Sequence, residues 1–175
     1  MSIFSLFNYK DLLLKCKLEA STLKDCSSHP EYDYILFNIV MGINHLFEWY
    51  LKDQSVGEKN KIACLCNFNP FNELDVVSAD FKSLYKKLEP FPNKNYHQEA
   101  IRQLCNKAKH FKQKMIERQD KNYTCLFGNE SFGNTSFGSF NHYLYFVELN
   151  GHDTDLSDLL VDLLKQWESF LEENV

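Results

Sequence analysis

The segment from residue 32 to residue 52 most constrains the fold, because it is apolar around most of a helical circumference. At about 100° per residue, most of its polar side chains fall on a single arc of about 120°, and these are Asn38, Asn44, His45, Glu48 and Lys52. A helix with so much apolar surface packs at the centre of a protein. Its embedded polar groups exclude a membrane span, so we expect a central core helix and no membrane partner.

Apolar residues at helical spacing predict further helices over residues 9–26, 78–88, 96–118 and 154–173. The last of these has the clearest apolar stripe, and Thr154 or Asp155 is the expected N-cap. Residues 54–60 indicate a loop, whereas residues 61–72 fit either a short helix or a short strand.

A change in composition separates the last helix from the others. Residues 127–140 repeat Phe-Gly-Asn at a period of five, which indicates a turn-rich loop. Residues 140–149 are rich in Tyr, Phe and Val, which favours a strand, and Asn150-Gly151 favours a sharp turn after it. The sequence thus predicts a mainly α protein, a helical bundle with a small β-hairpin inserted before the C-terminal helix.

The chain has 175 residues, of which 44% are hydrophobic, enough for one domain with a substantial core. We expect a single domain over residues 1–175, with a helical core at 5–120, a loop and β element at 122–150 and a final helix at 154–173. The net charge of −5 argues against general adhesion to nucleic acid or acidic lipid.

The first residues lack the features of a signal peptide, so we expect a cytoplasmic protein whose six cysteines are mostly buried thiols. Cys64-x-Cys66 lacks a second Cys/His pair at the spacing of a structural zinc site. We therefore expect neither a metal site nor a cofactor.

The helix predicted at residues 96–118 carries the most specific set of polar groups. Arg102, Asn106 and His110 fall within about 80° of one another, opposite an apolar face that includes Leu104 and Ala108. Histidine moves protons near neutral pH, arginine grips phosphate and asparagine can orient either group. This stripe suits phosphodiester chemistry or anion binding, and the alternative is a polar face in water.

The same helix is the one strongly basic segment of the chain, with Lys107, Lys109, Lys112 and Lys114 around the stripe. Such a basic strip is the local feature that contact with nucleic acid requires. The alternative is internal charge pairing, because residues 148–173 carry eight acidic side chains and a single lysine.

The central helix supplies a second candidate cluster, Asn44, His45 and Glu48. His45 and Glu48 are three residues apart and share a helix face, where a carboxylate can fix the tautomer of an imidazole and raise its basicity. If the two helices are neighbours, this pair can support His110. Otherwise it is the polar arc of a very apolar helix.

The chain resembles HEPN (higher eukaryotes and prokaryotes nucleotide-binding) domains in two features. These are the basic helix with Asn106-Lys-Ala-Lys-His110 and the central helix with embedded polar residues. The resemblance covers roughly residues 5–120 and implies an all-α bundle from a bacterial or mobile-element conflict or phage-defence system. It implies a metal-independent ribonuclease or a binder of RNA or nucleotide, with Arg102, Asn106 and His110 as catalytic residues and a homodimer around the cleft.

One position departs from the family pattern. The family's catalytic arginine usually precedes the asparagine directly, but Cys105 holds that position, and Arg102 lies one turn earlier. The alternative is therefore a non-catalytic helical module for protein interaction, such as an antitoxin-like regulator, whose charged helices dock on a partner protein.

Overall fold

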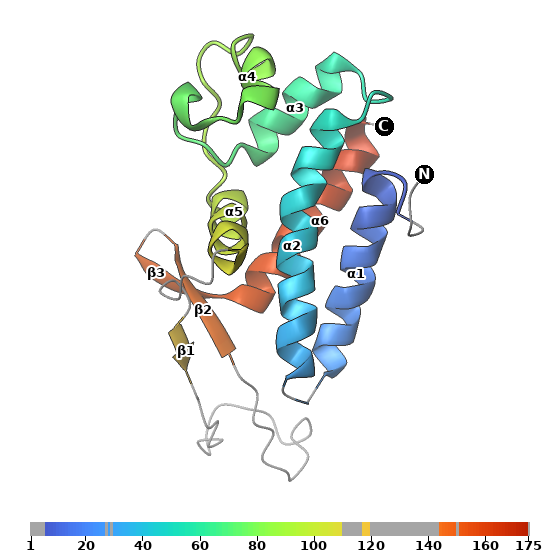
Figure 1. Ribbon diagram of the computed structural model, residues 1–175, viewed down its shortest axis with the longest axis vertical. Helices are drawn as coiled ribbons and strands as arrows, with labels where there is room; N and C mark the ends of the chain where they lie inside the picture. Colours follow the sequence, from blue (N-terminus) through green and yellow to red (C-terminus); the bar gives the residue numbers. More distant parts are fainter. Residues whose placement is uncertain are drawn as a thin grey trace.

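The computed structural model describes residues 6–26, 28, 30–109, 117–119, 144–149 and 151–174, and at 107–109, 117–119 and 144 it describes the backbone alone. The elements in chain order are α1 (Tyr9–Asp25), α2 (Glu31–Lys52), α3 (Glu58–Phe68), the 3-10 helix η1 (Leu74–Val76), α4 (Ala79–Tyr85), α5 (Tyr96–Lys109), β1 (Glu117–Gln119), β2 (Leu144–Leu149), β3 (His152–Asp155) and α6 (Leu156–Asn174). The predicted fold class is confirmed: helices dominate, and a small β-hairpin precedes the last helix (Figure 1).

Three long helices, α1, α2 and α6, lie side by side, and α1 runs opposite to the other two (Figure 1). A capping box fixes the start of α1. The Asn8 side chain accepts hydrogen bonds from the N–H groups of Lys10 and Asp11, and the Asp11 carboxylate accepts one from the Asn8 N–H. These bonds satisfy donors that a helix start otherwise leaves without partners.

An aromatic cluster joins α3 to the three long helices. Trp167 of α6 is fully buried, and its ring stacks on Phe68 of α3 with 3.9 Å between ring centroids. Tyr50 of α2 and Phe170 of α6 meet the Trp167 ring edge-on. Aromatic pairs add about 0.5–1.5 kcal/mol each to the free energy gained by burial, so this cluster anchors the upper end of the bundle in Figure 1.

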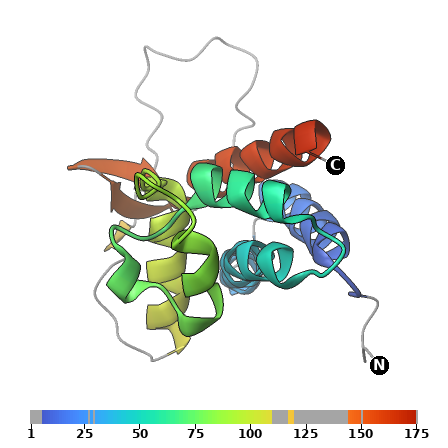
Figure 2. The same cartoon turned by 90° about the horizontal axis from the view of Figure 1, so that it is seen from above.

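The helix α5 lies beside α2 and crosses it at a steep angle (Figures 1 and 2). Its deepest side chains are Ile101 and Cys105, both fully buried. The predicted helix over residues 96–118 is wrong at residues 117 and 118, which belong to β1 and pair with β2. Glu, Arg and Gln are good helix formers, but pairing with a strand distant in the sequence overrides this local preference, so the helical core ends before residue 117.

The sheet has the order β1-β2-β3 with both pairings antiparallel, and Leu149 of β2 lies opposite His152 of β3. Gly151 in the turn between β2 and β3 has a φ of +80°, a conformation that glycine adopts without strain. The Asp155 carboxylate accepts a hydrogen bond of 2.7 Å from the Ser157 N–H at the start of α6. The predicted turn and N-cap are therefore confirmed.

The segment after α2 is more helical than expected. The helix α3 starts at Glu58, inside the predicted loop at 54–60, and it resolves the ambiguity at 61–72 in favour of a helix that ends at Phe68. In the part of the chain that the structure describes, no helix is both long and apolar enough to cross a bilayer.

Candidate functional site

Arg102 lies at the border of the buried face of α5. Its guanidinium carbon is 5.0 Å from the centre of the Phe71 ring, and its Nε atom is buried without a hydrogen-bond partner among the described residues. The expectation that Arg102 points away from the core is therefore only half right. The helix packs on α2 and also faces the Phe71 segment, so its buried arc extends to Gln98 and Arg102.

This placement leaves the positive charge of Arg102 available. No carboxylate in the described part of the chain forms an ion pair with it. The Phe71 ring attracts the cation through an interaction of about 0.5–2 kcal/mol. A guanidinium without a carboxylate partner is well suited to bind a phosphate or carboxylate of a ligand.

Asn106 of the predicted stripe is exposed, in agreement with the expected polar face. It follows Cys105, whose Sγ atom lies 3.3 Å from the Sδ atom of Met41 on α2. His110, Lys112 and Lys114 lie outside the described residues, as does the loop repeat at 127–140. Lys107 and Lys109 lie in the last turn of α5, where the structure describes the backbone alone.

The second predicted cluster is formed on α2. His45 and Glu48 lie together as expected, with 3.6 Å between the imidazole Nδ1 and a carboxylate oxygen, and both side chains are partly exposed. Asn44 differs from them because it is only 6% exposed. The polar arc predicted for this helix is therefore narrower than expected, with Asn44 inside the packed face.

The sequence left open whether the helix with His45 and Glu48 lies next to the helix with Arg102. It does, since α2 and α5 are neighbours. Met41, which touches Cys105, shares a helix face with His45 and Glu48. One turn of helix, about 6 Å, separates Met41 from His45. The imidazole–carboxylate pair thus lies near the crossing of the two helices, on the same side of α2 as α5.

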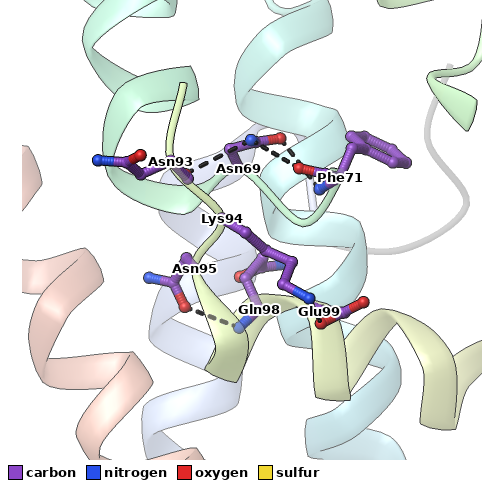
Figure 3. A network of polar contacts seen from close by, with 7 residues as sticks. All are labelled: Asn69, Phe71, Asn93, Lys94, Asn95, Gln98 and Glu99. Atoms are coloured by element: carbon purple, nitrogen blue, oxygen red, sulfur yellow. Dashed lines mark hydrogen bonds and ion pairs between the residues drawn. The ribbon is translucent and has the colours of Figure 1, made fainter. Parts of the chain in front are cut away.

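Asn69 is the residue that fixes the Phe71 segment (Figure 3). It is fully buried, and its amide donates hydrogen bonds to the carbonyl groups of Phe71 (2.9 Å) and Pro92 (2.7 Å). Its side-chain oxygen accepts from the Phe71 N–H (3.0 Å) and the Tyr85 hydroxyl (2.8 Å). Asn69 thereby positions the ring on which Arg102 lies.

Burial raises the pKa of Tyr85 well above its usual value, and the nearby Cys64 and Cys66 raise it further while the charge of Arg102 opposes them. The hydroxyl therefore stays protonated at any physiological pH and remains a donor to Asn69.

The start of α5 is held by the same network (Figure 3). The Asn95 N–H donates to the Asn69 carbonyl (2.7 Å), and the Asn95 side chain accepts from the Gln98 N–H (2.9 Å). Lys94 forms an ion pair with Glu99 at 2.6 Å. Sequence reasoning missed Asn69 and Asn95, although Asn95 followed by Gln98 three residues later is a signal for a helix N-terminus.

No group of three or more His, Cys, Asp or Glu side chains converges to hold a metal ion within the described ranges. The two cysteines of Cys64-x-Cys66 point in different directions on α3, because Cys64 is buried and Cys66 is exposed.

These features define the class: a mainly α-helical bundle with a three-stranded antiparallel sheet, in which Arg102 lies on α5 and the His45–Glu48 pair on the neighbouring α2. Comparisons with protein-family models, curated proteins and solved structures found no match to the chain.

Proposed function

We propose that the protein is a HEPN-like helical module that binds RNA or a nucleotide-bearing ligand at the crossing of α2 and α5 and cleaves RNA without a metal ion. The observation that carries the proposal is Arg102, which rests on Phe71 at 5.0 Å and has no carboxylate partner among the residues described. Structural arginines at such depth are usually neutralised by an acidic group. An arginine that is not neutralised is suited to a phosphate.

In the proposed reaction, Arg102 binds the phosphodiester and stabilises its developing negative charge. His110 removes the proton of the 2′-hydroxyl, and the 2′ oxygen forms a bond to the adjacent phosphorus as the bond to the 5′ oxygen breaks. The 5′ oxygen takes up a proton, so the products are a 2′,3′-cyclic phosphate and a 5′-hydroxyl. Asn106 orients the reacting groups, and the His45–Glu48 pair supports the site from α2.

The test is incubation of total RNA with the purified protein in the presence of a metal chelator, beside His110→Ala and Arg102→Lys. We expect the wild type to cleave and His110→Ala to be inactive, and Arg102→Lys to be slowed because lysine keeps the charge but loses bidentate binding. Exposed Lys86→Ala is the control, since it removes one cation near Tyr85 without touching the site.

Analysis of the ends of the RNA fragments is an independent test, because the proposed mechanism requires a 2′,3′-cyclic phosphate. Equal cleavage by the wild type and His110→Ala, or cleavage that needs a divalent metal, would overturn the ribonuclease proposal.

One observation favours a second candidate, a non-catalytic module that docks on a partner protein. The position before Asn106 is filled by Cys105, which is fully buried and in contact with Met41. Packing, and not chemistry, therefore determines the residue at that position. Absence of cleavage by the wild type favours this candidate, in which the same basic helix binds an acidic protein surface.

A further inference from the structure

A pocket of about 470 Å³ lies away from the crossing of α2 and α5, where the start of α5 faces the β2–β3 hairpin and α6. Its volume lies within the usual range of small-molecule sites, roughly 300–1,000 Å³. Eight residues line it, namely Lys94, Asn95, Tyr96, His97, Leu149, His152, Thr154 and Gln166.

The polar groups of this pocket come from three elements that meet only in the folded chain. His97 is in the first turn of α5, His152 and Thr154 are on β3, and Gln166 is on α6. The backbone that carries them is held by hydrogen bonds, because β3 pairs with β2. The Asn95 amide donates to both the Asn67 carbonyl (2.9 Å) and the Gln166 side chain (3.4 Å) and so joins the start of α5 to α6.

The donors in the lining outnumber the groups that would repel an anion. Each imidazole can donate a hydrogen bond from a ring N–H, and Thr154 adds a hydroxyl. Lys94 adds a cation whose charge is shared with Glu99 at 2.6 Å, and among the described residues that line the pocket none is a carboxylate. Two histidines with a lysine and a hydroxyl form a set of groups that binds phosphate oxygens.

The remaining lining residues suit the apolar part of a ligand. The Tyr96 ring is 47% exposed, and the Lys94 ammonium lies 4.5 Å from its centre. An exposed ring of this kind offers a surface on which a nucleobase can stack. Leu149 is a further apolar contact.

We propose that this pocket binds a small phosphate-bearing ligand, a nucleoside monophosphate in particular, with His97 and His152 contacting the phosphate. The proposal is independent of the proposed function, because it shares none of the residues assigned to that site.

The experiment is isothermal titration of the full chain with adenosine 5′-monophosphate, inorganic phosphate and adenosine. We expect binding of the monophosphate, weaker binding of inorganic phosphate and little binding of adenosine. His97→Gln and His152→Gln should each weaken monophosphate binding roughly 10- to 100-fold, since each removes a charge-assisted hydrogen bond.

Lys86→Gln is the control, because it changes an exposed side chain that lines neither site and should leave the affinity unchanged. His152 is exposed on a strand, so its replacement tests the site without threatening the fold. Three results would overturn the proposal: no binding of either phosphate-bearing ligand, equal affinity for adenosine and the monophosphate, or loss of binding in Lys86→Gln to the same degree as in the pocket variants.

Discussion

At the scale of single residues, the candidate site depends on Asn69, a buried side chain directly after α3. Asn69 makes hydrogen bonds from both ends of its amide and is completely buried. It holds Phe71, and Phe71 carries the guanidinium of Arg102. The position of Arg102 thus depends on two successive contacts, from Asn69 to Phe71 and from Phe71 to Arg102, and the first lies in the loop after α3.

Replacing this amide tests its role directly. We expect Asn69→Ala to lower the free energy of unfolding by roughly 2–4 kcal/mol, because it leaves several buried donors and acceptors without partners. Urea denaturation followed by circular dichroism measures the change. Asn67→Ala is the control, since Asn67 is exposed, and it should change stability by about 0.5 kcal/mol or less. Equal effects of the two substitutions would contradict this role for Asn69.

The thiol of Cys16 provides a second test at this scale. Burial raises its pKa to about 12, so the folded protein keeps the proton while the unfolded chain loses it near pH 8.5. The unfolded state then binds fewer protons, and the free energy of unfolding falls as pH rises from about 8.5 towards 12.

We expect Cys16→Ala to reduce this loss of stability with pH, because it removes one buried thiol whose pKa is raised, while Cys64, a second such thiol, remains. The comparison is the slope of unfolding free energy between about pH 8.5 and pH 10. Cys66→Ala, at an exposed position of α3, should keep the slope of the wild type. A slope that is the same with and without Cys16 would show that this thiol is not protected from ionisation.

At the scale of elements, close packing of α1 on α2 depends on Gly42. A Cβ atom at this position would overlap the Sγ atom of Cys16. We expect Gly42→Ala to destabilise the protein by about 1–3 kcal/mol through overpacking, even though alanine favours a helix by about 1 kcal/mol over glycine.

Thermal or urea unfolding gives the sign of this effect. Gly57→Ala is the matched control, because a Cβ atom there meets nothing within 4 Å, and it should change stability by less than about 1 kcal/mol. An increase in stability in Gly42→Ala would refute close approach of the two helices.

The elements also show how far the sequence alone could lead. Apolar periodicity identified α1, α2, α4 and α6, because each has a stripe that the folded core buries. The same reasoning extended α5 through residue 118, since the pairing of β1 with β2 depends on a segment about 27 residues away that local pattern does not reveal.

For the candidate site, helical geometry predicted the His45–Glu48 contact and the exposure of Asn106. It could not predict that Phe71 lies under Arg102, because that contact joins α5 to the loop between α3 and α4. The pocket at His97 and His152 was missed for the same reason: its walls are brought together by tertiary structure alone.

At the scale of the whole molecule, α5 connects two polar regions, the pocket at its start and the crossing with α2 at its middle. Its start faces the β-hairpin and α6, and its middle crosses α2 (Figures 1 and 2). The pocket is lined by residues from the first of these regions. The helices α1, α2 and α6 contribute most of the buried hydrophobic core. The polar groups of the pocket and of the Arg102 region come from α5 and the segments that pack around it. The proposed function assigns RNA to the crossing, where the cation of Arg102 is held by a ring and not by a carboxylate.

The most direct test of this account is the affinity of the protein for a single-stranded RNA oligonucleotide, measured by fluorescence anisotropy for the wild type, Arg102→Gln and Lys86→Gln. We predict that Arg102→Gln binds at least about tenfold more weakly and that Lys86→Gln stays within about twofold of the wild type. Circular dichroism should show the same helical content in all three. Equal RNA affinity in the wild type and Arg102→Gln, or equal losses in both variants, would contradict the central role of Arg102.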